Sequence, residues 1–247
     1  MSLLAFEHVT KRYPDGRRDL LALNDVSFEL DDRDFIGVWG MRRSGKSTLL
    51  QVAAGIDLPS EGVVRFDGKD LAELSDDART ELLRGRGIGL VHSDRRPDRR
   101  QMTVERVATP LLADGLAFGE AKEVAHKMMD LVGVLSCANA STASLSRGES
   151  LRVELARALV HEPRVLLVDE PAVLIGHRER EEFLQMLRSV KRTCGLALIV
   201  VSEEVSVIRV AARAMTIGKG VLRSSDKEGE LVQFPGGRAS SAQSSTP

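Results

Sequence analysis

The chain is poor in aromatic side chains, which make up 4 % of its 247 residues and include one tryptophan and one tyrosine. Because platforms that stack unpaired bases are built from such side chains, this composition disfavours single-stranded nucleic acid as a partner. The formal net charge of −1 gives no overall attraction to nucleic acid or to an anionic membrane surface. We therefore expect no nucleic-acid partner.

Long hydrophobic runs and paired cysteines are also missing. The most apolar stretch, Gly195–Val201, is far too short to span a bilayer. Charges appear too early at the N-terminus for a signal peptide. The two cysteines, Cys137 and Cys194, have no CxxC spacing and suit a reducing compartment. We expect a soluble, cytoplasmic protein that needs a partner for any membrane span.

What the sequence does contain is 43 % apolar residues, arranged as alternating strand and helix patterns. The first 30 residues predict a β-hairpin, and the βαβα order that follows predicts a parallel sheet covered by helices. Residues 71–86 and 104–139 are expected to be helical throughout. We therefore expect an α/β domain over residues 1–227, with a helical subdomain inserted at about 94–155. The Gly/Ser-rich end, 228–247, is expected to be disordered.

A phosphate-binding motif lies between a predicted strand and a predicted helix. Gly40, four further residues and then Gly45-Lys46-Ser47 fit the pattern GxxxxGK[ST]. Backbone N–H groups and the helix N-terminus of such a loop bind phosphate. Lys46 would reach the β- and γ-phosphates, and the Ser47 hydroxyl would coordinate Mg²⁺. The residues expected to bind ATP here are Gly40, Met41, Arg42, Arg43, Ser44, Gly45, Lys46, Ser47 and Thr48.

Two acids follow the apolar run VLLV, at Asp169 and Glu170. An acid at the end of a buried strand can hold Mg²⁺, so Asp169 is the expected metal ligand beside Ser47. The next acid can polarise the attacking water, so Glu170 and Lys46 are the expected catalytic residues. Together with the phosphate-binding motif, this pair indicates a site for ATP and Mg²⁺.

The segment LSRGESLRVELARAL, residues 145–159, carries a family resemblance. With the two motifs above, it makes the chain similar to the nucleotide-binding subunit of an ABC transporter, from Leu3 to about Arg223. The start VTKRYPDG and the spacing from IGLV to this segment resemble the branch serving lipoprotein release, macrolide export and cell division. The resemblance implies a P-loop NTPase core of ABC type, an N-terminal antiparallel β subdomain and an inserted helical subdomain.

The resemblance also implies partners. ATP sites of the family form between two subunits arranged head to tail, so a homodimer or a heterodimer with a related ATPase subunit is expected. Tyr13 falls where the family stacks an aromatic ring on adenine. Ser146 and Gly148 fall in the signature motif, which faces the γ-phosphate of the opposite subunit. A membrane-spanning permease subunit would hold the chain peripherally at the inner face of the cell membrane, and it would determine the transported substrate.

Several positions depart from the family pattern. Arg42 and Arg43 replace small residues in the phosphate loop, where they could restrict the loop or add positive charge near an anion. Arg147 replaces the first glycine of the signature. Three further positions usually hold glutamine, aspartate and histidine, and here they are Ser93, Gly176 and Glu203.

These departures leave three hypotheses open. The residues that hold phosphate and metal remain, so we expect Mg-ATP to bind and hydrolysis to be slow or absent. The chain would then be a transporter ATPase subunit, or a catalytically impaired, ATP-sensing scaffold. A soluble ATPase acting on nucleic acid or ribosomes is the third hypothesis. The lack of a second nucleotide-binding domain and of a long heptad run counts against it.

Overall fold

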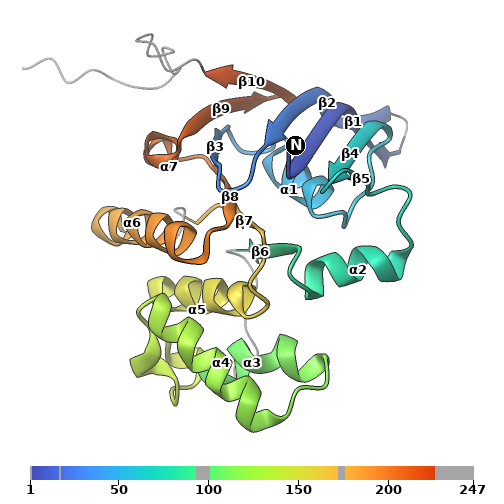
Figure 1. Ribbon diagram of the computed structural model, residues 1–247. Coiled ribbons are helices and arrows are strands. Elements are labelled where there is room, and N and C mark those ends of the chain that lie inside the picture. Colours follow the sequence, from blue (N-terminus) through green and yellow to red (C-terminus); the bar gives the residue numbers. More distant parts are fainter. Residues whose placement is uncertain (1, 17, 93–100, 172–175, 226–247) are drawn as a thin grey trace, which may run out of the picture.

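A computed structural model describes residues 2–16, 18–92, 101–171 and 176–225. Its ten strands form two sheets (Figure 1). The smaller sheet is antiparallel, with the order β2-β1-β4-β5, and the first two strands form the predicted hairpin. Its strands are β1 (Leu4–Asp15), β2 (Arg18–Leu30), β4 (Glu61–Phe66) and β5 (Lys69–Asp70).

The larger sheet has the order β10-β9-β3-β8-β7-β6, and every pairing from β9 to β6 is parallel. The edge strand β10 pairs with β9 in antiparallel fashion. All residues of β7 and β8 are buried, as expected for central strands covered on both faces. The strands are β3 (Phe35–Trp39), β6 (Ile88–His92), β7 (Val165–Asp169), β8 (Ala197–Ser202), β9 (Arg213–Gly218) and β10 (Val221–Ser225).

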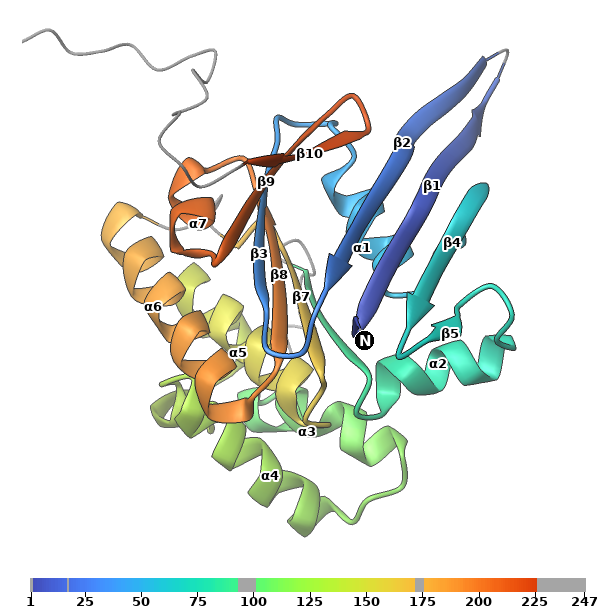
Figure 2. The ribbon, with the colours of Figure 1, turned by 45° about the horizontal axis from the view of Figure 1, so that its top comes forward.

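Two hydrophobic cores lie on opposite faces of the larger sheet. Val165 and Leu167 of β7 pack with α1 (Lys46–Ala53) and the smaller sheet, whereas Leu166 and Val168 pack with α5 (Arg147–Leu159) and α6 (His177–Cys194). The alternation follows from the period of two along a strand. Figure 2 shows α1 between the two sheets. The other helices of the α/β core are α2 (Asp76–Arg84), α6 (His177–Cys194) and α7 (Val205–Val210).

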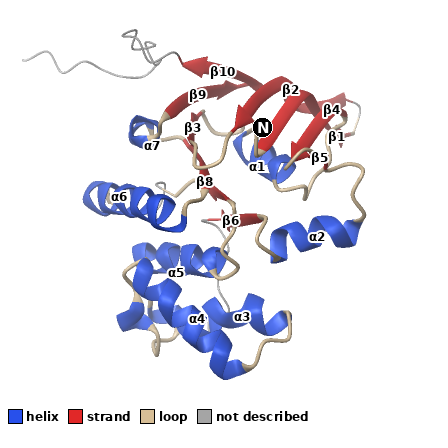
Figure 3. Ribbon diagram, viewed as in Figure 1, coloured by secondary structure: helices blue, strands red, loops and turns tan. Residues whose placement is uncertain are grey.

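The helical subdomain packs below the larger sheet, where Figure 3 shows its helices in blue. An ion pair joins α3 to α5, because Nε of Arg106 lies 2.9 Å from Oε1 of the buried Glu154. Arg157 lies 3.5 Å from the other oxygen of Glu154. The subdomain consists of α3 (Thr103–Ala113), α4 (Phe118–Leu131), 3₁₀ turns at Leu135–Cys137 and Thr142–Ser144, and α5 (Arg147–Leu159).

Two helix predictions were wrong in their extent. Residues 104–139 are not helical throughout, because the chain turns after α3 through Gly115, whose φ of 87° is left-handed. The helix expected from residue 71 begins at Asp76, because Ser75 caps it by accepting a hydrogen bond from the N–H of Ala78.

The tail at 228–247 lies outside the described residues, and the domain boundaries stay predictions.

The predicted fold class is confirmed: an α/β core, an N-terminal antiparallel sheet and an inserted helical subdomain. The carboxyl ends of β3, β7 and β8 meet at one edge of the larger sheet, where ligands bind in open α/β folds. In the part of the chain that the structure describes, no helix combines the length and apolar character needed to cross a bilayer.

Candidate nucleotide-binding site

The loop between β3 and α1 has the backbone expected of a phosphate cradle. A Cβ on Gly40 would lie 2.5 Å from the Ile217 carbonyl oxygen, and one on Gly45 would lie 2.4 Å from the Ala22 carbonyl oxygen. Gly45 has a φ of 108°, so both space and conformation require glycine. No side chain caps the start of α1 in the described structure, so its first N–H groups can receive an anion.

The two unusual arginines of this loop, Arg42 and Arg43, are both exposed to solvent. Arg43 has a φ of 60°, which shows that the loop keeps a left-handed residue even without glycine there. Met41 is exposed and Thr48 half-buried. The buried Ser44 hydroxyl has no hydrogen-bond partner among the described residues.

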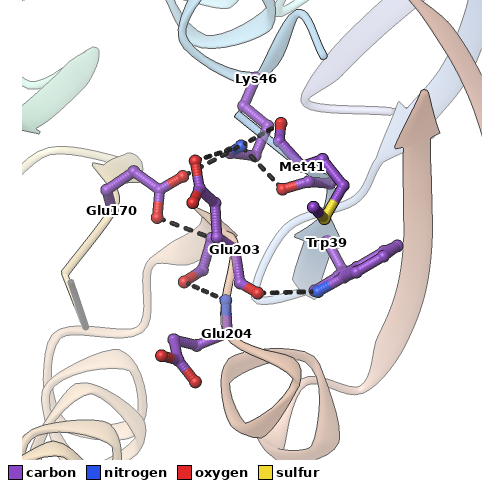
Figure 4. Close-up of polar contacts among 8 residues, drawn as sticks. Trp39, Met41, Lys46, Glu170, Glu203 and Glu204 are labelled. Atoms are coloured by element: carbon purple, nitrogen blue, oxygen red, sulfur yellow. Dashed lines mark hydrogen bonds and ion pairs between the residues drawn. The ribbon is translucent and has the colours of Figure 1, made fainter. Parts of the chain in front are cut away.

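Lys46 folds back over the loop (Figure 4). Its side chain is buried, and its Nζ donates to the carbonyl oxygens of Gly40 and Met41, both at 2.8 Å. The same Nζ lies 3.1 Å from Oε1 of Glu170 and 3.7 Å from Oε1 of Glu203. The structure therefore brings together the two predicted catalytic residues, with a second carboxylate beside them.

Glu170 directly follows β7 in a left-handed conformation, with a φ of 48°. Its N–H donates to the carbonyl oxygen of Val201 in β8, and its Oε2 accepts from the N–H of Glu203 at 3.0 Å. Burial is the largest cause of the raised pKa of Glu170, and hydrogen bonds from the Glu203 N–H and Lys46 oppose the rise. The charge of Glu203 adds to the rise. A carboxylate with a raised pKa, fixed at a strand end, suits a general base.

Asp169 ends β7 and is 9 % exposed. Its Oδ1 has no hydrogen-bond partner within the described residues, and its Oδ2 lies 3.8 Å from Nδ1 of His92, the register partner in β6. A buried carboxylate oxygen without a partner is costly unless a cation or donor joins it. Because a carboxylate and a hydroxyl are oxygen ligands, Asp169 and the exposed Ser47 fit the requirements of Mg²⁺.

Tyr13 of β1 lies beside α1. Its hydroxyl donates to Asp57 and also hydrogen-bonds with Thr48 of that helix. Burial raises the pKa of Tyr13 to about 12, with a further contribution from Asp57, so the phenol stays protonated. Nζ of Lys11 lies 5.0 Å from the ring centroid. The aromatic ring is therefore next to the helix that follows the phosphate loop.

The signature residues form a helix start away from this loop. Ser146 caps α5 by accepting from the Glu149 N–H at 3.2 Å, and Glu149 accepts from the Ser146 N–H at 2.8 Å. Arg147 is the exposed first residue of α5. A Cβ on Gly148 would lie 3.7 Å from Glu179 of α6. None of the described hydrogen bonds of Ser146 or Gly148 reaches the phosphate loop, so this chain's own loop and signature are separate.

Of the three positions that depart from the family's glutamine, aspartate and histidine, the structure describes two. Ser93 lies outside the described residues, as do residues 172–175 before Gly176. Gly176 itself is the N-cap position of α6 and provides no side-chain hydrogen bond. Glu203 lies at the site beside Lys46.

Sequence reasoning missed two contacts at the site. Nε1 of Trp39 donates to the Glu203 carbonyl oxygen at 2.9 Å, and no sequence pattern signalled this bond. The position of His92 beside Asp169 could have been found from the register of two parallel strands. Both contacts join strand ends that are far apart in the chain.

Comparisons with known proteins agree with this geometry. A family model described as ABC transporter matches residues 23–173. The methionine import ATP-binding protein MetN 1 of Yersinia pestis bv. Antiqua (strain Antiqua) is 30 % identical over 234 residues, which cover 94 % of this chain and 68 % of that protein. The specific branch expected from the sequence stays a prediction.

Two solved structures share the fold. The ATP-binding cassette MJ0796, in a dimeric post-hydrolysis state bound to ADP and Pi, has a TM-score of 0.83 at 27 % identity, over 92 % of this chain and 100 % of that one. The cbiO1 protein from Clostridium perfringens has a TM-score of 0.79 at 22 % identity, over 90 % of this chain and 87 % of that one, which supports the fold alone. With the family match spanning most of the sequence and both sheets in place, the chain belongs to the ABC transporter family as an ATP-binding subunit.

Proposed function

We propose that the chain holds Mg-ATP in the loop between β3 and α1 and couples its binding to a membrane-spanning permease. The observation that carries this proposal is the position of Lys46, whose ammonium group lies over the glycine-bounded loop and faces Glu170. A buried lysine at an uncapped helix start suits an anion as ligand. The MetN 1 relative, named as an import ATP-binding protein, supports a transport role.

Each residue has a role in the proposed reaction. The loop amides and Lys46 would bind the phosphates, with Lys46 exchanging carboxylate contacts for phosphate oxygens. Asp169 and Ser47 would hold Mg²⁺, which neutralises phosphate charge when bound. Glu170, oriented by the Glu203 N–H, would orient the attacking water and accept its proton.

The proposed assembly is a dimer on a permease. The dimeric state of MJ0796 supports a dimer. In the head-to-tail arrangement that the family resemblance implies, Ser146 and Gly148 would face the nucleotide of the second subunit. The capping box orders this signature before any partner binds. Both a homodimer and a heterodimer fit this arrangement. The permease would hold the dimer at the inner face of the cell membrane.

The first experiment measures Mg-ATP binding by calorimetry and phosphate release at matched concentrations. The wild-type chain is compared with Lys46→Ala and with Lys69→Ala, an exposed lysine of β5. We expect Lys46→Ala to lose binding by a factor of about 100 and Lys69→Ala to bind as the wild type does. Absence of binding in the wild type, or equal binding by Lys46→Ala, would overturn the proposal.

A second candidate is an ATP-sensing subunit with slow or absent turnover. Glu203 favours it, because its carboxylate lies near Lys46 at the position where the family carries a histidine. The test is phosphate release by the wild type and by Glu170→Gln, with nucleotide binding measured for both. Equal background release from the two proteins supports the sensing role. Release by the wild type that Glu170→Gln abolishes contradicts it.

A further inference from the structure

Lys46 has more acceptors around it than it has N–H donors. Its ammonium group carries three donors. Around it lie the carbonyl oxygens of Gly40 and Met41 at 2.8 Å, Oε1 of Glu170 at 3.1 Å and Oε1 of Glu203 at 3.7 Å. The Glu203 carboxylate is the most distant of the four, so it is a charge neighbour of Lys46 and not a tightly bound partner (Figure 4).

The backbone of Glu203 is fixed from two sides. Its N–H donates to Oε2 of Glu170 at 3.0 Å, and its carbonyl oxygen accepts from Nε1 of Trp39 at 2.9 Å. The side chain is 38 % exposed, whereas that of Lys46 is 5 % exposed. Glu203 therefore presents its carboxylate at the solvent side of Lys46, from a backbone that is held in place.

The next residue shows that this arrangement is particular to Glu203. The Glu204 N–H donates to the Ser202 hydroxyl at 3.0 Å, and its carboxylate pairs with Nη1 of Arg180 at 2.9 Å. Within the described ranges, Glu203 forms its ion pair with Lys46. The two adjacent acids thus have different partners. Glu204 pairs with Arg180 of α6, whereas Glu203 faces Lys46 of the phosphate loop.

We infer that Glu203 determines nucleotide specificity: its carboxylate lies 3.7 Å from the Lys46 ammonium group on the solvent side, so it would face the terminal phosphate of a triphosphate and favour nucleoside diphosphates. This inference rests on the proposed function, since it concerns the same phosphate cradle. A diphosphate satisfies Lys46 and leaves Glu203 in place. A triphosphate would bring an additional anionic group towards this carboxylate, whose backbone is held in place, and like charges repel in a partly buried site.

The experiment measures dissociation constants of ADP and of a non-hydrolysable ATP analogue by calorimetry, with Mg²⁺ and at constant ionic strength. The proteins are the wild type, Glu203→Gln, Glu203→Ala and the control Glu204→Gln. We expect the wild type to prefer ADP by at least about tenfold. Both Glu203 variants should shift the ratio of the two constants towards the triphosphate by about tenfold, or about 1.4 kcal/mol. Glu204→Gln should keep the wild-type ratio.

The outcomes separate the two proposals. A wild type that binds the triphosphate as tightly as ADP would overturn this inference and leave the proposed function standing. The same ratio in the wild type and both Glu203 variants would also overturn it. Failure of the wild type to bind either nucleotide would overturn the proposed function and the inference together.

Discussion

The backbone N–H of Glu203 donates to Oε2 of Glu170 at 3.0 Å, so the end of β8 fixes the carboxylate that follows β7. Oε1 of each acid lies within 4 Å of the Lys46 ammonium group. The charge of Glu203 contributes to the raised pKa of Glu170. A change at Lys46 or at Glu203 will therefore also change the pKa of Glu170.

The first prediction concerns strain in the phosphate loop. Arg43 has a left-handed φ of 60°, which costs an L-residue about 1 kcal/mol or more, whereas glycine adopts it freely. Arg43→Gly should therefore be more stable than the control Arg42→Gly by about 1 kcal/mol, since both add the same glycine flexibility to the unfolded chain. Urea unfolding measures the difference. Equal free energies of unfolding for the two variants would contradict the prediction.

The second prediction concerns Tyr13. Tyr13→Phe keeps the ring and loses only the hydroxyl bonds to Asp57 and Thr48, so its affinity for ADP should stay within about threefold of the wild type. Tyr13→Ala should lower that affinity by about tenfold, because stacking of a base on an aromatic ring contributes about 1–3 kcal/mol. Equilibrium titration with ADP is the measurement. If alanine and phenylalanine bind alike, Tyr13 does not stack on the base.

The third prediction concerns the helical subdomain. Glu154 of α5 is buried between Arg106 of α3 and Arg157, which also belongs to α5. Glu154→Ala leaves a nearly buried arginine without this partner, so we expect a loss of about 3 kcal/mol in the free energy of unfolding. The control is Glu182→Ala, which removes an exposed pair with Arg178 within α6 and should cost about 0.5 kcal/mol or less. Similar losses in both variants would show that burial of the pair is unimportant.

The fourth prediction concerns pH. Burial lowers the pKa of His161 below its ordinary value of 6.5, although the carboxylates of Asp114 and Glu81 oppose the shift. Below that pH the unfolded chain binds a proton that the folded chain does not. Stability from this group is therefore present above pH 6.5 and is lost as the pH falls towards the folded pKa.

His161→Gln should accordingly lose less stability than the wild type between pH 8 and pH 5.5, by urea unfolding at each pH. His8→Gln is the control, because the His8 side chain is 83 % exposed. The prediction would be contradicted if the free energy of unfolding of His161→Gln depended on pH as that of the wild type does. It would also be contradicted if both variants changed this dependence equally.

Local sequence patterns predicted most of this fold. The strands β3, β6 and β7 are short apolar runs bounded by polar or glycine residues, so their positions follow from the sequence. The break after α3 was missed because Gly115 interrupts a stretch whose apolar period continues on both sides. The start of α2 was missed because the capping bond of Ser75 outweighs the apolar spacing before it.

The candidate site was predictable only where its residues are neighbours in the chain. The phosphate loop with Lys46, and the pair Asp169 and Glu170, are each read from a few consecutive residues. Glu203 was noted only as a departure from the family pattern, because its contact with Lys46 depends on the strand order β3-β8-β7. Strand order results from packing of the whole domain, which single-sequence patterns do not specify.

The bond from Trp39 to the Glu203 carbonyl oxygen has a practical consequence. Trp39 is the one tryptophan of the sequence, and its indole lies at the end of β3, directly before the phosphate loop. Indole emission responds to hydrogen bonding and to the polarity of its surroundings. The unlabelled protein therefore carries an optical probe at this strand end, and any movement of the Glu203 backbone will change the fluorescence of a single, assigned residue.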